Sequence, residues 1–132
     1  MQASYNRNVH ELSIAYDLIE SADAAARRAG AAKVNAVHLR LGRLSGVVSD
    51  ALQFGYDIAA KGTLLEGSRL VIEELPAVIY CESCGSEFEL PGIQNFCCPQ
   101  CGTPSRQIRQ GKELEIHSME VEMEAVEPLM NA

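Results

Sequence analysis

Apolar residues recur every three or four positions between His10 and Ala29, and this spacing predicts an amphipathic helix. Gly30 predicts the end of this helix, because glycine readily adopts the left-handed conformation that closes a helix. The polar stretch QASYNRN before His10 has no such period, and we expect no regular structure there. The apolar positions of the predicted helix are Leu12, Ala15, Tyr16, Ile19, Ala22 and Ala26.

Alternation of apolar and polar residues predicts three strands, within residues 32–42, 68–75 and 112–124. In the third strand the apolar positions change from even to odd numbers near His117 and Ser118, which predicts a bulge there. The first strand places Val37, Leu39 and Leu41 on one face, and Ala36, His38 and Arg40 on the other.

A second helix is predicted between the first two strands, from Ser49 to Lys61, with Ser49 as its N-cap. Its apolar stripe consists of Leu52, Gly55, Tyr56 and Ala59. This order of elements predicts an α+β fold, with two helices on one face of a small, mostly antiparallel three-stranded sheet. We expect residues 9–79 and 111–127 to form one discontinuous domain, into which residues 80–110 are inserted as a second.

Five cysteines lie close together in the inserted segment of a chain that has no export signal. Four of them form two Cys-x-x-Cys turns separated by 13 residues, Cys81 with Cys84 and Cys98 with Cys101. Two such turns bring four thiolates to one tetrahedral zinc ion. Cys97 completes no such turn and is expected to be a thiol outside the site. Redox exchange is the less favoured alternative, because it usually employs a single turn of this kind.

The segment SEFELPGIQNF between the two turns predicts a small hairpin. Its sizeable apolar side chains are only Phe88, Leu90 and Phe96. So small a core cannot stabilise about 30 residues alone, and we expect zinc to supply most of the folding free energy of this zinc ribbon. A site closed by four cysteines has no open position for a substrate water, so the zinc is expected to be structural and the protein not an enzyme.

The chain is acidic, with 18 Asp and Glu against 11 Lys and Arg and a formal net charge of −7. Such a surface repels phosphate backbones, so nucleic acid is not expected as a partner. The basic residues that follow the cysteines, Arg106, Arg109 and Lys112, are offset by Glu82, Glu87 and Glu89. No apolar run approaches the roughly 18 residues of a membrane span, so we expect a cytoplasmic protein without a membrane partner.

His10 and Glu11 stand side by side at the start of the first predicted helix, and local sequence allows two interpretations. The plain one is a solvated histidine beside an acid that the helix dipole stabilises. The other is a metal site, in which a terminal amine, a backbone amide nitrogen and an imidazole form a planar nitrogen arrangement suited to Ni(II) or Cu(II). The latter requires a histidine near the terminus, and here it is tenth. His38 and His117 are expected to be exposed residues of the sheet.

Five segments, in order along the chain, resemble the HypA/HybF family of hydrogenase nickel-incorporation proteins: VHELSIAYDLIE, VHLRLGRLSGV, CESCGSEFEL, FCCPQCG and GKELEIHSMEVE. The resemblance implies that His10 binds Ni(II), with the backbone amide and side chain of Glu11 as further donors. It also implies structural Zn(II) on the four paired cysteines. The expected function is that of a metallochaperone, which binds nickel transiently and delivers it to the large subunit of [NiFe]-hydrogenase.

The resemblance further implies a HypB-type GTPase and the hydrogenase large subunit as partners, urease maturation proteins in some members, and either monomers or homodimers. Members begin Met-His-Glu, whereas here eight residues precede Val9. A valine in the initiator position indicates a GUG start, so residues 1–8 are expected to be a non-native extension that displaces the terminal amine from His10. The alternative function is a zinc-ribbon module, structural or nucleic-acid-binding, without nickel.

Overall fold

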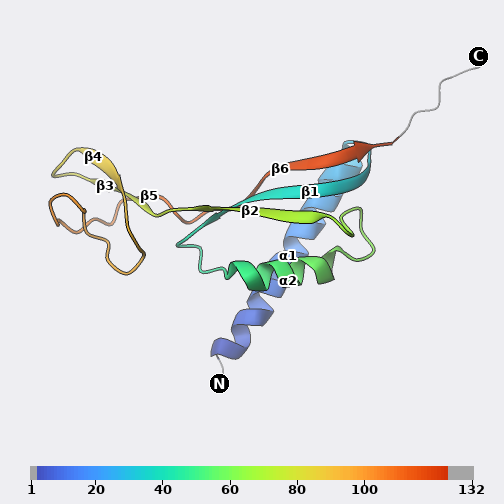
Figure 1. The fold of residues 1–132 in the computed structure, drawn as a ribbon, viewed down its shortest axis with the longest axis horizontal. Coiled ribbons are helices and arrows are strands. Elements are labelled where there is room, and N and C mark those ends of the chain that lie inside the picture. Colours follow the sequence, from blue (N-terminus) through green and yellow to red (C-terminus); the bar gives the residue numbers. More distant parts are fainter. Residues whose placement is uncertain (1–2, 125–132) are drawn as a thin grey trace, which may run out of the picture. The chain divides into compact units, whose positions relative to one another are not determined.

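The structure is a computed structural model that describes residues 3–124, with side chains described from His10 onwards. Residues 1–2 of the predicted extension and 125–127 of the predicted outer domain lie outside the described residues. The described elements are α1 (Ala3–Arg28), β1 (Ala31–Gly42), α2 (Ser49–Ala60), β2 (Arg69–Leu75), β3 (Val78–Cys81), β4 (Ser86–Glu89), β5 (Ile108–Gln110) and β6 (Leu114–Met123) (Figure 1). They form an α+β fold with two three-stranded sheets, in the orders β2-β1-β6 and β4-β3-β5.

The described chain divides into two compact units. Leu39–Val47 and Ile72–His117 form the second unit, and the other described residues form the first. Strands β1, β2 and β6 therefore each contribute residues to both units. The predicted domain bounds, 9–79 with 111–127 and 80–110, follow the sequence motifs and stay a prediction.

The sheet of β1, β2 and β6 is mixed, which corrects the prediction of a mostly antiparallel sheet. At the end of β1, Arg43 donates a backbone hydrogen bond of 2.9 Å to Leu75 O at the end of β2, so these two strands are parallel. Gly42 donates one of 2.8 Å to Glu113 O just before β6, so β1 and β6 are antiparallel. The parallel pair arises because α2 carries the chain back before β2 begins.

Helix α1 begins at Ala3, well before the predicted start at His10. The preceding stretch contains neither glycine nor proline, so nothing in it interrupts a helix that the following residues stabilise. The predicted inner face is confirmed at Ala15, Ile19, Ala22 and Ala26, which are buried. Tyr16 was assigned to that face wrongly, since half of it is exposed.

Helix α2 is confirmed, with its predicted stripe of Leu52, Gly55, Tyr56 and Ala59 buried. Its N-cap is Val48 rather than Ser49, and no side chain of the cap residue hydrogen-bonds the helix start. Both helices lie on one side of the sheet of β1, β2 and β6 (Figure 1).

The two faces of β1 are both largely covered. Val37, Leu39 and Leu41 are buried as predicted, but Ala36 on the opposite face is buried too. His38, expected to be exposed, is half-buried, and its Nε2 lies 2.7 Å from Glu120 Oε2 on β6. His117 is exposed as expected.

Along β6, the half-buried apolar residues are Ile116 and Met119, which reproduces the predicted change from even to odd positions. The bulge that would accompany this change stays a prediction.

The second sheet corrects the predicted hairpin. Only Ser86–Glu89 of the segment between the cysteine turns forms a strand, and it pairs antiparallel with β3, with Cys81 opposite Ser86. Pro91 and Gly92 stop the strand, because proline lacks the donor that a ladder needs and glycine weakens a strand. The core of this sheet consists of Ala77, Ile79, Cys81, Leu90 and Cys98, with Phe88 and Phe96 packed against it.

Candidate metal sites

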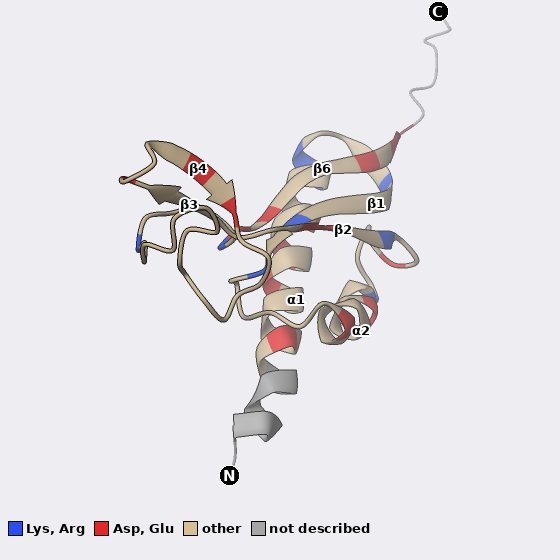
Figure 2. Ribbon diagram, turned by 60° about the vertical axis from the view of Figure 1, so that its left-hand side comes forward, with Lys and Arg blue, Asp and Glu red and all other residues tan. Residues whose placement is uncertain are grey.

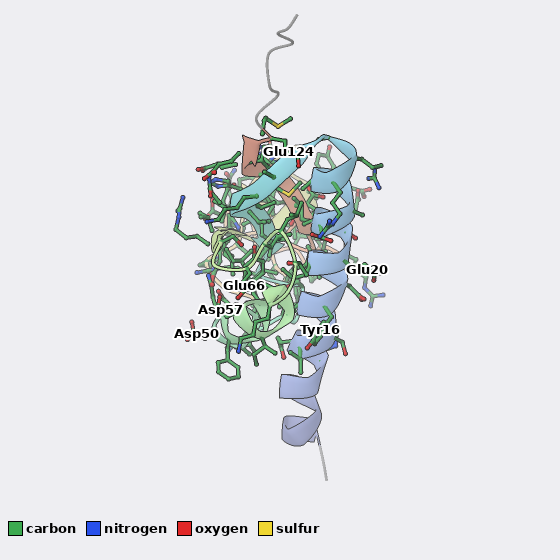
Figure 3. All side chains as sticks on the ribbon, turned by 90° about the vertical axis from the view of Figure 1, so that its right-hand side faces the viewer. Tyr16, Glu20, Asp50, Asp57, Glu66 and Glu124 are labelled. Carbon is green, nitrogen blue, oxygen red and sulfur yellow. The ribbon has the colours of Figure 1, made fainter. Side chains whose placement is uncertain are left out.

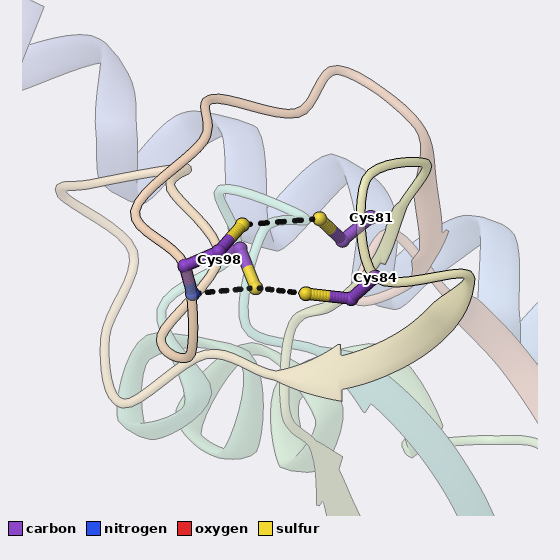
Figure 4. A group of neighbouring side chains, drawn as sticks. Cys81, Cys84 and Cys98 are labelled. Atoms are coloured by element: carbon purple, nitrogen blue, oxygen red, sulfur yellow. Dashed lines mark hydrogen bonds between the residues drawn. The ribbon is translucent and has the colours of Figure 1, made fainter.

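The structure brings the four paired cysteines together. Their sulfur atoms all lie within 4.8 Å of one another, with 3.6 Å between Cys81 Sγ and Cys101 Sγ and 4.0 Å between Cys84 Sγ and Cys98 Sγ (Figure 4). A tetrahedral zinc ion with Zn–S bonds of about 2.3 Å places its sulfur ligands about 3.8 Å apart. The spacing of these four thiols therefore fits a zinc ion.

Two similar turns hold the sulfur atoms in place. Gly85 donates a backbone hydrogen bond of 2.7 Å to Cys81 O, and Gly102 donates one of 2.8 Å to Cys98 O. Both glycines have positive φ angles, 69° and 79°, which side-chain-bearing residues rarely adopt. The Cys101 backbone N–H also points at Cys98 Sγ, at 3.5 Å, and stabilises negative charge on that sulfur.

The thiols of the cluster differ in acidity when no cation is present. Hydrogen bonds with the side chain and backbone of Thr103 lower the pKa of Cys101 to about 6. Hydrogen bonding with Cys101 and burial raise the pKa of Cys84 to about 12. Four thiolates so close together repel one another, so all four ionise only with a cation among them.

Cys97 is half-buried and lies outside the four-cysteine cluster. Its backbone forms an isolated antiparallel bridge with Pro104. This placement agrees with the expectation drawn from its position beside Cys98.

The basic residues of the ribbon are partly engaged within it. Arg109 Nε lies 3.9 Å from Glu87 Oε2, and its guanidinium carbon lies 4.7 Å from the centre of the Tyr80 ring. An arginine held by a carboxylate and an aromatic face is less available to a phosphate backbone. The contacts of Arg109 therefore argue against a nucleic-acid-binding role for the ribbon.

The neighbours His10 and Glu11 point in different directions. His10 is exposed on α1, whereas Glu11 is fully buried. Glu11 Oε2 accepts a hydrogen bond of 2.7 Å from the Val48 backbone N–H, and Oε1 has no hydrogen-bond partner among the described residues. The Glu11 carboxylate thus anchors the start of α2, and it does not lie beside an exposed imidazole.

The burial of Glu11 has a signal in the sequence, although the His-Glu motif alone does not reveal it. Glu11 precedes Ala15 by four residues and Ile19 by eight, so it continues the buried face of α1. Within the part of the chain that the structure describes, no histidine or carboxylate joins His10 in a group of three potential ligands. His10 offers its imidazole, while its amide N–H belongs to the hydrogen-bond ladder of α1.

Residues 9–121 match the family model described as hydrogenase/urease nickel incorporation, metallochaperone, HypA. The chain belongs to the HypA family. It is 55% identical over 114 residues to a hydrogenase maturation factor HypA of Roseiflexus sp. (strain RS-1), covering 86% of this chain and 93% of that protein. It is 48% identical over 112 residues to the HypA of Chloroflexus aggregans, covering 85% and 98%.

The fold is also that of solved HypA structures. The solution structure of the Ni metallochaperone HypA from Helicobacter pylori superposes with a TM-score of 0.62 at 22% identity, covering 86% of this chain and 98% of that one. A second solution structure of a HypA protein gives a TM-score of 0.65 at 22% identity, covering 88% and 98%.

HypA proteins are metallochaperones and maturation factors rather than enzymes, which agrees with the closed character of the four-cysteine site. The family match starts at Val9, directly before His10. Within residues 3–124, no helix is both long and apolar enough to cross a membrane.

Proposed function

We propose that this chain binds Ni(II) through His10 and delivers it to the large subunit of a [NiFe]-hydrogenase, while the four cysteines hold a structural Zn(II). The observation that carries the proposal is the match of residues 9–121 to a nickel-incorporation family, with an exposed histidine at the start of the matching segment. No step of bond-making chemistry is required.

Ligand chemistry and burial support this division between two metals. Thiolates retain zinc, and Cys81 and Cys98 are almost completely buried, at 1% and 2% exposure. Imidazole nitrogen suits nickel, and an exposed imidazole such as that of His10 exchanges its ion readily. A carrier needs an exchanging imidazole site for its cargo and a retaining thiolate site for its own structure.

The extension of α1 before His10 bears directly on nickel binding. A planar nickel site built from an imidazole and backbone nitrogens needs those nitrogens deprotonated, whereas in α1 the His10 and Glu11 amides donate to carbonyls one turn earlier. A helix that starts at residue 9 leaves its first four N–H groups without such partners. We therefore propose that the helical turns of α1 before His10 weaken nickel binding, and that a protein restarted at residue 9 binds nickel more tightly.

The proposed partners are a HypB-type GTPase and the hydrogenase large subunit, both in the cytoplasm. Membership in a family named for hydrogenase and urease maturation supports partners of this class. Urease maturation proteins and a second copy of the chain are further partners that the family allows.

Nickel content of the hydrogenase tests the proposal. In cells that lack their own copy of this gene, we expect His10→Ala to reduce nickel in the purified large subunit by about tenfold or more, as loss of a metal ligand does. His117→Ala is the matched control, because His117 is also exposed but lies on β6. Normal loading by the His10 variant, or an equal loss in the control, would rule the proposed role out.

A further inference from the structure

Two exposed aromatic side chains flank the point where α1 and α2 cross. The helices approach closely at Gly55, where a Cβ atom would lie 3.3 Å from Ala15 Cβ. Tyr16 follows Ala15 and Phe54 precedes Gly55, so both lie beside this crossing, and Figure 3 shows Tyr16 on α1 next to α2. They are 50% and 72% exposed. Folding of the first unit leaves both rings largely in water, although aromatic rings gain much from burial.

The exposed ring of Phe54 lies in an acidic setting. Asp50, Phe54 and Asp57 are exposed and follow one another at intervals of four and three residues, so they share the outer face of α2. Figures 2 and 3 show acidic residues on this helix, with Asp50 and Asp57 on the same side. Val48, at the N-cap of α2, adds a further exposed apolar side chain.

We propose that this surface, formed by Tyr16, Val48, Asp50, Phe54 and Asp57 and called the crossing face, docks the GTPase partner of the nickel delivery proposed above. Phe54 enters an apolar pocket of that partner, and lysine or arginine side chains around the pocket pair with Asp50 and Asp57. This inference rests on the nickel-carrier function proposed above and specifies the chemistry of its partner.

Charge decides between a basic partner and a second copy of the chain. A symmetric dimer through the crossing face would place Asp50 and Asp57 of one copy against the same carboxylates of the other. Like charges across an interface oppose association, and the chain has a formal net charge of −7. A partner with basic residues around an apolar pocket gains attraction where a second copy meets repulsion.

The crossing face lies within reach of the proposed nickel ligand. Tyr16 follows His10 by six residues on the same helix, which corresponds to about 9 Å along the axis. A typical protein interface buries about 800 Å² per partner, a patch wide enough to include both positions. Six residues also place Tyr16 and His10 about 120° apart around α1, so we infer that a partner docked on the crossing face reaches His10 by extending around this helix.

Calorimetry with the purified HypB-type GTPase of the same organism, titrated into the zinc-loaded full chain, tests the crossing face. We expect Phe54→Ala to weaken binding by about tenfold or more, as truncation of an aromatic anchor does. Ile93→Ala is the matched control, because Ile93 is an exposed apolar residue of the second unit, and it should bind as the wild type does. No binding by the wild type, unchanged binding by the Phe54 variant, or an equal loss in the control would overturn the proposal.

A second arm examines the charges. Raising the ionic strength should weaken wild-type binding, and the double variant Asp50→Asn with Asp57→Asn should show a smaller dependence on salt. A salt dependence identical in both proteins would contradict a basic partner surface and overturn the proposal.

Ni(II) titration of the same proteins separates this inference from the proposed function. Phe54→Ala should keep the nickel affinity of the wild type and its urea unfolding midpoint, because the side chain is mostly exposed. If Phe54→Ala binds the GTPase as tightly as the wild type does and nickel binding is intact, only the docking surface is overturned. Absence of nickel binding in both the full chain and the protein restarted with methionine in place of Val9 contradicts the proposed function instead.

Discussion

The side chain of Glu11 stabilises the fold, although the family motif around it suggests a role in metal binding. It is fully buried, and its Oε2 accepts the Val48 backbone N–H at the N-cap of α2. The N-terminal end of α2 thus receives a hydrogen-bond acceptor from another helix. His10, one residue earlier, is exposed, and it is the nickel ligand of the proposed function.

Replacing Glu11 should therefore change stability. Glu11→Ala leaves the Val48 N–H without its acceptor and creates a cavity, and we expect a loss of about 2 kcal/mol in the free energy of unfolding. Glu11→Gln keeps an acceptor oxygen and nearly the same volume, so its loss should be smaller. Urea unfolding of the three zinc-loaded proteins measures both values, and wild-type stability in the alanine variant would show that the buried carboxylate anchors nothing.

Cys97 and Cys98 are adjacent in sequence but differ in role. Cys98 Sγ lies 4.0 Å from Cys84 Sγ within the cluster, whereas Cys97 lies outside it. If the four cysteines hold zinc as proposed, Cys98→Ser should lose that ion and the amide-exchange protection of β3, β4 and β5, because we expect the metal to supply most of the folding free energy of this sheet. Cys97→Ser should keep about one zinc per chain. Metal analysis that finds zinc retained in the first variant, or lost in the second, would reverse the assignment.

Among the elements, α1 is fastened to the segment before β2 through Asp23. Its Oδ1 accepts a hydrogen bond of 2.9 Å from the Leu64 N–H, and its Oδ2 lies 2.9 Å from Arg27 Nε. Partial burial opposes ionisation, but Arg27 and the Leu64 N–H outweigh it and lower the pKa of Asp23 below its usual 3.8. The folded state therefore favours the ionised form of the Asp23 side chain.

This shift predicts how stability depends on pH. Because the folded pKa is depressed, the contribution of Asp23 is present above pH 3.8 and is lost as the pH falls through the folded value. Asp23→Asn should be less stable than the wild type by about 0.5 to 1 kcal/mol at about pH 7, since it retains an acceptor for Leu64 but not the charge. Unfolding curves at several pH values should show this difference disappear in acid, and a difference that persists at about pH 2 would contradict the assignment.

Hydrophobic periodicity was sufficient to locate both helices and the three strands of the larger sheet, because apolar residues recur along each at the spacing of its secondary structure. It did not indicate the start of α1, since helix propagation into residues 3–9 depends on the absence of a breaker rather than on an apolar stripe. It also did not indicate the direction of β2, because strand direction is set by the connection through α2. The predicted hairpin overlooked the effect of Pro91 and Gly92.

The two candidate sites differed in how far the sequence could define them. Two Cys-x-x-Cys turns are enough to bring four sulfur atoms together, so the cluster could be predicted from the spacing alone. The position of Glu11 depends on α2, a contact between segments 37 residues apart, which the motif around His10 does not contain. Nothing in the periodicity of α2 marked Phe54 as an exposed anchor beforehand, because single exposed apolar residues are common.

Across the whole molecule, the proposed function separates two metals by ligand and by access. In this proposal the four-cysteine cluster retains zinc, and the exposed imidazole of His10 on α1 carries nickel. The chain has no need of an open zinc coordination position, and its acidic surface is suited to basic protein partners. In the docking proposal, the exposed ring of Phe54 anchors such a partner.

Calorimetric Ni(II) titration of three zinc-loaded proteins examines the assignment of nickel to His10. These are the full chain, the protein restarted with methionine in place of Val9, and the His10→Ala variant of the restarted protein. We predict that the restarted protein binds nickel more tightly than the full chain, because its first amides are free of helix hydrogen bonds, and that the variant loses this binding. Equal nickel affinity of the restarted protein and its His10→Ala variant would contradict the separation of two metals.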